Sequence, residues 1–245
     1  MIKKEDGATV NLSDVSFLQK GRGKDLLFLH GYLSSKEAFT RQIEYFSRFY
    51  RVTALDFIGF GQSAPLREPY SVGEYAAWLY DVMGALRLKR PHVVAHSFGC
   101  RVAVKLASEQ GSAFDKMVLT GPAGVILKRG FAYRLKVGTY RLVKRFAPVF
   151  AEKKFGSAEY RTLSPVMKES YKKIVNEDLR ECARRVENPV LIIEGREDRV
   201  TPKEEAEAYR DCFPSAILRF VSGGHFAFVE EPLAFNLLTE EFLYE

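Results

Sequence analysis

Short apolar runs alternate with amphipathic helical patterns along most of this chain, and this alternation limits the possible folds more than any other feature. Six runs rich in branched and aromatic residues predict buried strands at 26–30, 50–56, 92–96, 116–121, 189–195 and 216–222. Helical patterns lie between them, at 36–48, 74–86, 102–109, 202–212 and 232–243, and Thr201 is predicted to cap the fourth of these helices. The first 20 residues predict a short antiparallel strand. Together these patterns predict an α/β fold with a mostly parallel sheet flanked by helices.

The alternation is interrupted once, between Gly121 and Pro189, where only a basic helical pattern is present. We therefore predict that residues 122–188 form an all-α cap, inserted into a core made of residues 1–121 and 189–245. A cap at this point of the chain would cover the carboxyl edge of the sheet, where open α/β sheets bind their ligands.

Positive charge is concentrated in the predicted cap. The chain has a net charge of +6, and residues 125–186 hold 16 basic and 6 acidic residues. One helical stripe in this segment carries Arg134, Arg141 and Arg145, and another carries Phe131, Leu135, Leu142 and Phe146. The basic stripe predicts either a solvated face or contact with an anionic amphiphilic substrate or an anionic membrane surface. No nucleic-acid partner is expected, because no aromatic stacking platform or groove-reading motif accompanies the charge.

The remaining composition narrows the class of protein. Apolar residues make up 47% of the chain, enough for one large core, and no stretch of 18 apolar residues predicts a membrane span. The first 15 residues contain no apolar run, so no secretory signal is expected. Three cysteines without a CxxC or His/Cys cluster predict neither a disulfide framework nor a metal site, and they favour a cytoplasmic location. The oligomeric state is left open by the sequence.

The segment VVAHSFGCR (93–101) places a serine directly between a predicted strand and a predicted helix. Such a turn holds Ser97 in a tight, strained backbone and needs small neighbours, which Gly99 and Ala95 supply. The hydroxyl would project above the sheet, beside the next amide N–H and the helix N-terminus. Ser97 is therefore the predicted nucleophile, while Cys100 and His96 are predicted to be structural.

A serine hydroxyl needs a base to take its proton, and the chain contains four histidines. His92 lies at the far end of its strand, about 13 Å from Ser97 at ~3.3 Å per residue. His96 adjoins Ser97 but would point elsewhere in the turn. His30 ends a strand at the correct edge, in a loop suited to offering N–H groups. His225 lies in a glycine-rich loop after the last strand, can reach over the same edge, and is the predicted base.

The base in turn needs a carboxylate that orients it and stabilises its charged form. Asp198 follows the strand at 189–195 and lies at the correct edge of the sheet, so it is preferred to Glu194 and Glu197. Asp56 could serve as a further partner but is predicted to form a turn.

These segments together resemble the α/β-hydrolase superfamily over the whole chain. The order Ser97, Asp198, His225 is the order of nucleophile, acid and base in that superfamily. AHSFG (95–99) resembles its nucleophile elbow, with Ala95 where glycine is usual. HGY (30–32) resembles its oxyanion loop and DFIGFGQS (56–63) the loop beside the nucleophile, while GREDRVTP and GGHFAFVEEP resemble its acid and base loops.

The resemblance implies a capped serine hydrolase of the esterase or lipase kind, similar to uncharacterised bacterial members. It implies that the backbone amides of Tyr32 and Phe98 form the oxyanion hole, that Ser97 forms an acyl-enzyme with a small-molecule acyl substrate, and that no cofactor is needed. Serine rather than aspartate at position 97 argues against dehalogenase and epoxide-hydrolase chemistry. An acyltransferase, a carbon–carbon bond hydrolase and a receptor-like binding module remain as alternatives.

Overall fold

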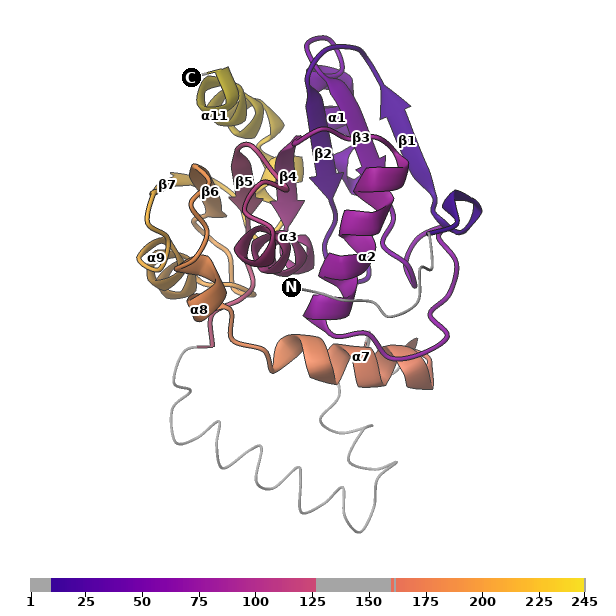
Figure 1. The fold of residues 1–245 in the computed structure, drawn as a ribbon. Coiled ribbons are helices and arrows are strands. Elements are labelled where there is room, and N and C mark those ends of the chain that lie inside the picture. The colour runs from indigo at the N-terminus through magenta and orange to yellow at the C-terminus, as the bar shows by residue number, and fades with distance from the viewer. Residues whose placement is uncertain (1–9, 127–159, 161, 245) are drawn as a thin grey trace, which may run out of the picture.

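Seven strands form one sheet in the computed structural model, which describes residues 10–126, 160 and 162–244. Their order across the sheet is β1-β3-β2-β4-β5-β6-β7, with β1 antiparallel to β3 and every other pair parallel (Figure 1). The strands are β1 (Phe17–Lys20), β2 (Asp25–Leu29), β3 (Arg51–Leu55), β4 (His92–His96), β5 (Met117–Thr120), β6 (Val190–Gly195) and β7 (Ala216–Val221). The predicted α/β fold is confirmed, including the antiparallel first strand.

The central strands are apolar because both faces of the sheet are covered. Every residue of β2, β4, β5 and β6 is buried, as expected for parallel strands between two layers of helices. The register pairs Leu29 with Ala95 and His96 with Thr120, so the carboxyl ends of β2, β4 and β5 meet at one edge. Residues that follow these strands are therefore brought together.

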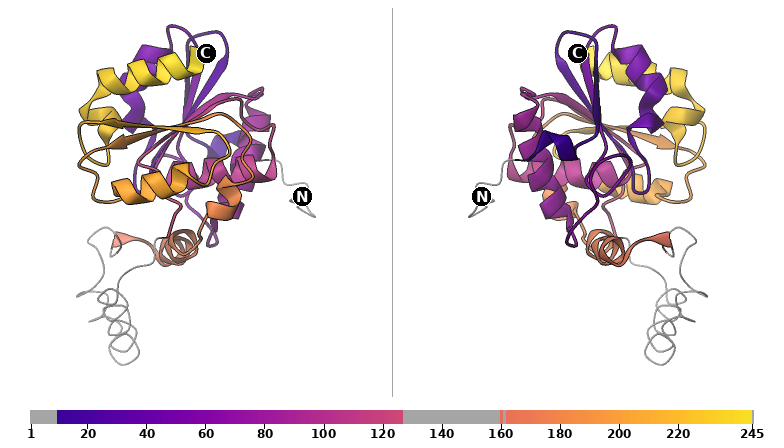
Figure 2. Two further views of the ribbon diagram at one scale, coloured as in Figure 1. Left: turned by 90° about the vertical axis from the view of Figure 1, so that its left-hand side faces the viewer. Right: turned by 90° about the vertical axis from the view of Figure 1, so that its right-hand side faces the viewer.

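Helices cover both faces of the sheet, and two side views show the sheet between them (Figure 2). The 3-10 turns are η1 (Leu12–Asp14) and η2 (Lys36–Phe39). The described α-helices are α1 (Thr40–Phe46), α2 (Val72–Ala85), α3 (Phe98–Glu109), α7 (Pro165–Val175), α8 (Arg180–Ala183), α9 (Lys203–Arg210), α10 (Ala227–Glu230) and α11 (Pro232–Tyr244).

Two hydrophobic clusters, one on each face, hold the layers together. Alternate residues along a strand point to opposite faces, so Val93 packs with residues of α2 and α3 whereas Val94 packs with residues of α1, α10 and α11. Trp78 of α2 lies in the first cluster and is 4% exposed. Helix α2 begins with a reciprocal capping box, in which the side chains of Ser71 and Glu74 each accept a hydrogen bond from the other residue's backbone amide.

The described part of the predicted cap contains two helices, α7 and α8, and residues 122–126 lie in a loop. Helix α7 crosses the carboxyl ends of the parallel strands, and α8 packs against α3 (Figure 1). Leu179, Ala183 and Val186 are fully buried in the same cluster as α2 and α3, so this stretch joins the core of the body. The boundaries at 122 and 188 remain a prediction, and the basic stripe with Arg134, Arg141 and Arg145 lies outside the described residues.

None of the helices in the described ranges is both long enough and apolar enough to cross a membrane.

Candidate active site

Ser97 occupies the strained turn that the sequence predicts. Its backbone has φ 48° and ψ −105° between the end of β4 and the start of α3, a conformation that residues with a side chain rarely adopt. The amide of Ser97 donates a hydrogen bond to the carbonyl oxygen of Thr120 at 3.1 Å. A Cβ atom on Gly99 would lie 2.5 Å from the carbonyl oxygen of Leu29, which explains why glycine is needed two residues after the serine.

Asp198 and His225 form a hydrogen-bonded pair, as predicted. Oδ2 of Asp198 lies 2.7 Å from Nδ1 of His225. When Nδ1 carries a proton, it donates a hydrogen bond to this carboxylate oxygen. The other carboxylate oxygen, Oδ1, accepts the backbone amides of Val200 at 2.7 Å and Thr201 at 3.0 Å. Burial alone would raise the pKa of Asp198, but the hydrogen bond and charge of His225, with the amide of Thr201, hold it well below its usual range. Asp198 is therefore an anion that orients the imidazole.

The side chain of Thr201 contacts both Asp198 and His225 and does not cap a helix. Helix α9 starts at Lys203, and Pro202 is the residue at its N-cap. The hydroxyl of Thr201 instead donates to Oδ2 of Asp198 at 2.9 Å and lies 3.3 Å from Nδ1 of His225. The prediction that Thr201 is the N-cap of this helix was wrong, because the turn after β6 folds back on the carboxylate and the Thr201 side chain faces Asp198.

The two rival carboxylates lie in different surroundings. Glu197 is exposed and accepts the backbone amide of Gly223 at 2.6 Å. Glu194 is completely buried, and neither of its carboxyl oxygens has a hydrogen-bonding partner of normal geometry among the described residues. Burial, with the negative charge of Asp198 beside it, raises the pKa of Glu194 to about 9. Glu194 is thus a neutral acid at pH 7 and is not the group that pairs with His225.

The other three histidines make contacts within the fold, and His96 supports the loop that carries His225. Nε2 of His96 donates to the carbonyl oxygen of His225 at 2.9 Å, and the two rings lie 4.7 Å apart. Burial and the neighbouring His225 lower the pKa of His96 to about 3, so its ring stays neutral. His30 is buried and accepts the amide of Phe57 at 3.0 Å, while buried His92 lies at the opposite end of β4 from Ser97.

Asp56 and Cys100 have the structural roles predicted for them. Asp56 accepts the amides of Lys36 at 2.7 Å and Gln62 at 2.9 Å, and it pairs with the ammonium group of Lys36 at 2.8 Å. It therefore fixes two turns. Cys100 is fully buried, its thiol donates to the carbonyl oxygen of Ala95 at 3.1 Å, and burial raises its pKa. Such a thiol is not a nucleophile.

The two amides predicted as oxyanion donors are available. Neither the amide of Tyr32 nor that of Phe98 donates a hydrogen bond to another described residue. Phe98 is the first residue of α3, so its N–H belongs to the unsatisfied first turn of the helix. The rings of the two residues meet edge to face at 5.6 Å, and the phenol of Tyr32 donates to the carbonyl oxygen of Met167 at 3.2 Å. This bond links the loop after β2 to α7.

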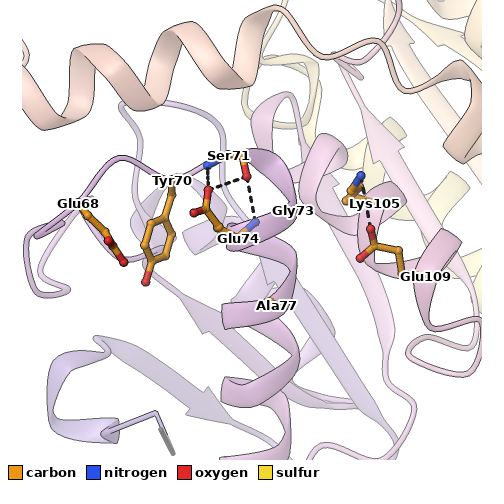
Figure 3. A pocket seen from close by; sticks show the side chains of 8 residues that line it. All are labelled: Glu68, Tyr70, Ser71, Gly73, Glu74, Ala77, Lys105 and Glu109. Atoms are coloured by element: carbon orange, nitrogen blue, oxygen red, sulfur yellow. Dashed lines mark hydrogen bonds and ion pairs between the residues drawn. The ribbon is translucent and has the colours of Figure 1, made fainter. Parts of the chain in front are cut away.

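A cavity of about 850 Å³ connects these groups. Its described lining includes Ser97, His225, Tyr32 and Phe98, and α7 contributes Tyr171 and Ile174 from the opposite side. A second hollow, of about 410 Å³, lies at the surface between α2 and α3, away from these residues. Figure 3 shows two pairs among its polar residues, Ser71 with Glu74 and Lys105 with Glu109. The larger cavity is the candidate active site.

This arrangement brings together the predicted nucleophile, the predicted base with its carboxylate partner, and the two predicted backbone donors. The hydroxyl of Ser97 has no hydrogen-bonding partner among the described residues, so the transfer of its proton to His225 remains a prediction. Sequence reasoning missed the role of Thr201 and also missed Arg101, which lines the cavity from α3. A basic residue one helical turn after the serine was the available signal for Arg101.

Comparison with known proteins agrees with the fold. The family described as "alpha/beta hydrolase fold" matches residues 25–158, more than half of the chain, and the chain belongs to this family. It is 29% identical over 266 aligned positions to the AB hydrolase superfamily protein YisY of Bacillus subtilis, covering 98% of this chain and 97% of that protein.

Two solved structures share the fold. A bacterial membrane phospholipase A superposes with a TM-score of 0.77 at 22% identity, covering 94% of this chain and 82% of that one. The meta-cleavage product hydrolase CumD of Pseudomonas fluorescens superposes with a TM-score of 0.73 at 24% identity, covering 94% of both chains. Both likenesses show that the chain has the α/β-hydrolase fold.

Proposed function

We infer that this chain is a serine hydrolase that cleaves a carboxylic ester or a related acyl substrate. The observation that carries this inference is the hydrogen bond between Asp198 and His225 at the rim of the cavity that Ser97 lines. A buried anion on Nδ1 fixes the imidazole with Nε2 free to accept a proton.

The reaction proceeds in two halves. Oγ of Ser97 attacks the substrate's carbonyl carbon while Nε2 of His225 takes the hydroxyl proton, and the carbonyl oxygen becomes an oxyanion. The amides of Tyr32 and Phe98 donate to that oxyanion, each contributing about 3–4 kcal/mol in comparable sites. The tetrahedral intermediate collapses, and the alcohol leaves with the proton from His225. Water then attacks the acyl-enzyme, loses a proton to His225 and releases the acid as Oγ of Ser97 regains its proton.

The chain's own residues supply each part of this reaction, and no step uses a cofactor. The same residues would also serve acyl transfer to another acceptor or cleavage of a carbon–carbon bond in a ketonic substrate. Product analysis distinguishes these reactions, because acyl transfer gives a new ester when an alcohol is added and carbon–carbon cleavage requires a ketone.

A panel of p-nitrophenyl esters with increasing acyl length tests the proposal. Wild type is expected to release p-nitrophenol with a burst equal to the enzyme concentration where deacylation is slow, and Ser97→Ala is expected to show neither burst nor turnover. Equal rates for wild type and Ser97→Ala across the panel would overturn the proposal.

A further inference from the structure

Arg101 is a buried cation in the wall of the candidate active site. It lies in the first turn of α3, four residues after Ser97, and both residues line the cavity. Its exposed fraction is 7%. Among the described residues that line the cavity it is the only lysine or arginine, and most of the others are apolar or aromatic.

Two of the five N–H donors of the Arg101 guanidinium already make hydrogen bonds. Nη1 donates to the carbonyl oxygens of Ile174 at 3.0 Å and Glu177 at 2.8 Å, at the carboxyl end of α7. A guanidinium has five N–H donors, which leaves the Nε–H and the two Nη2–H donors without a partner among the described residues. The Nε–H and one of the Nη2–H donors form an edge of the guanidinium that binds a carboxylate through two parallel hydrogen bonds.

The charge of Arg101 is not neutralised by an ion pair within the described part of the chain. The carboxylates closest to it are Glu177, Asp178 and Glu205, and none forms an ion pair with the guanidinium. Glu177 pairs with Lys105 at 3.1 Å and Asp178 with Arg180 at 2.8 Å. A buried cation normally has an anionic partner. Glu205 lines the same cavity and acts electrostatically on Arg101, and a substrate that enters the cavity can bring an anion into direct contact with the guanidinium.

We propose that Arg101 binds a carboxylate carried by the substrate, so that the preferred substrates are esters with a carboxylate about one helical turn from the scissile carbonyl. This rests on the proposed function and adds a substrate class to it. The two bonds from Nη1 hold the guanidinium in place before the substrate enters, so the free edge is oriented in advance. The carboxylate can belong to the acyl part or to the alcohol part of the ester, and the test separates these two sources.

The experiment measures kcat/KM by pH-stat at pH 7.5 for two pairs of series. The first pair consists of monoethyl esters of four- to eight-carbon dicarboxylic acids and ethyl esters of monocarboxylic acids of equal length. The second consists of acetate esters of ω-hydroxy acids and acetate esters of simple alcohols of equal length. The readout is the ratio of kcat/KM for the charged ester to that for its neutral match, in which losses common to both esters cancel.

We expect wild type to prefer the charged ester by about 10- to 100-fold at one chain length in one of the pairs, the range for charge-assisted hydrogen bonds. Arg101→Gln should reduce this ratio at least tenfold. Arg101→Lys retains the charge but not the paired donors, so its ratio should fall severalfold. Lys20→Gln removes an exposed cation on β1, away from the cavity, and should leave the ratio unchanged.

The opposite outcomes are equally clear. A wild-type ratio near one in both pairs of series, at every length, would overturn the inference without any variant. Equal ratios in wild type, Arg101→Gln and Arg101→Lys would show that Arg101 only joins α3 to α7. In either case, turnover of the neutral esters that depends on Ser97 would leave the proposed function intact. Absence of turnover of every ester by wild type would instead overturn the proposed function and this inference with it.

Discussion

Nδ1 of His225 lies 2.7 Å from Oδ2 of Asp198, although 27 positions separate the two residues in the sequence. The two loops meet because β6 and β7 are parallel neighbours whose carboxyl ends share one edge of the sheet. Asp198 is completely buried at its side chain, and the side chain of His225 is 12% exposed. A carboxylate shielded from water and a ring open to the cavity are the conditions for an orienting acid and a working base.

Replacement of Asp198 by asparagine should reduce kcat/KM for a p-nitrophenyl ester by about 10³- to 10⁴-fold, because an amide cannot stabilise the charged imidazole and favours the wrong tautomer. Steady-state kinetics on the purified variant measure this loss. Glu197→Gln is the matched control, since Glu197 is exposed on the same loop and should retain full activity. Full activity in Asp198→Asn with an inactive Glu194→Gln would reassign the acid.

Thr201→Val keeps the shape of the side chain but removes the hydroxyl that donates to Asp198. We expect kcat to fall about 3- to 10-fold with little change in KM, the usual size of one lost hydrogen bond. Thr201→Ser should restore most of the rate because it restores the donor. A kcat for Thr201→Val equal to that of wild type would show that the hydroxyl does not contribute to positioning the pair.

Glu194→Gln should change the pH dependence of stability. Burial, with Asp198 nearby, raises the pKa of Glu194 to about 9, so the folded chain keeps this proton while the unfolded chain loses it near the ordinary pKa of 4.5. The unfolded state therefore binds fewer protons between these values, and this residue makes the wild type less stable as the pH rises.

The glutamine variant has no such proton, so its free energy of unfolding should increase relative to wild type by up to ~1.4 kcal/mol per pH unit across that window. Urea denaturation at pH 5, 7 and 9 measures the difference. A constant difference at all three pH values would contradict a neutral Glu194.

Gly99→Ala should destabilise the fold, because the added Cβ would lie 2.5 Å from the carbonyl oxygen of Leu29. The expected loss is about 1–3 kcal/mol, as for other overpacked sites. Gly84→Ala is the control: it lies near the end of α2, where a Cβ would meet nothing within 4 Å, and should be neutral or raise stability by up to ~1 kcal/mol. Thermal unfolding should give Gly99→Ala a melting temperature clearly below that of wild type. Gly84→Ala should have a melting temperature equal to or above that of wild type.

The sequence predicted the elements, and it placed Ser97, Asp198 and His225 at one edge of the sheet, because each of these depends on a local pattern. The strands are apolar runs that end at turns. Ser97 directly follows one such strand and has the small residues Ala95 and Gly99 two positions before and after it. The register that aligns the ends of β4, β5 and β6 follows from parallel pairing, so residues just after those strands could be placed at one edge.

Thr201 and Arg101 could not be assigned in this way because their partners are set by tertiary packing. A threonine before Pro202 has the local pattern of a helix cap, and only the fold of the loop after β6 turns it towards Asp198. The sequence around Arg101 predicts only a polar position in an amphipathic helix. Its hydrogen-bond acceptors, the carbonyl oxygens of Ile174 and Glu177, lie more than 70 positions further along the chain.

The central claim is that Ser97 is the nucleophile activated by His225, and covalent labelling tests it most directly. Wild type treated with a fluorophosphonate should gain one adduct by intact mass spectrometry, and peptide mapping should place that adduct on Ser97. His225→Ala, which keeps the serine but removes its base, should label far more slowly, and Ser97→Ala should not label. An adduct that persists in Ser97→Ala, or one that maps to another residue in wild type, would contradict the account.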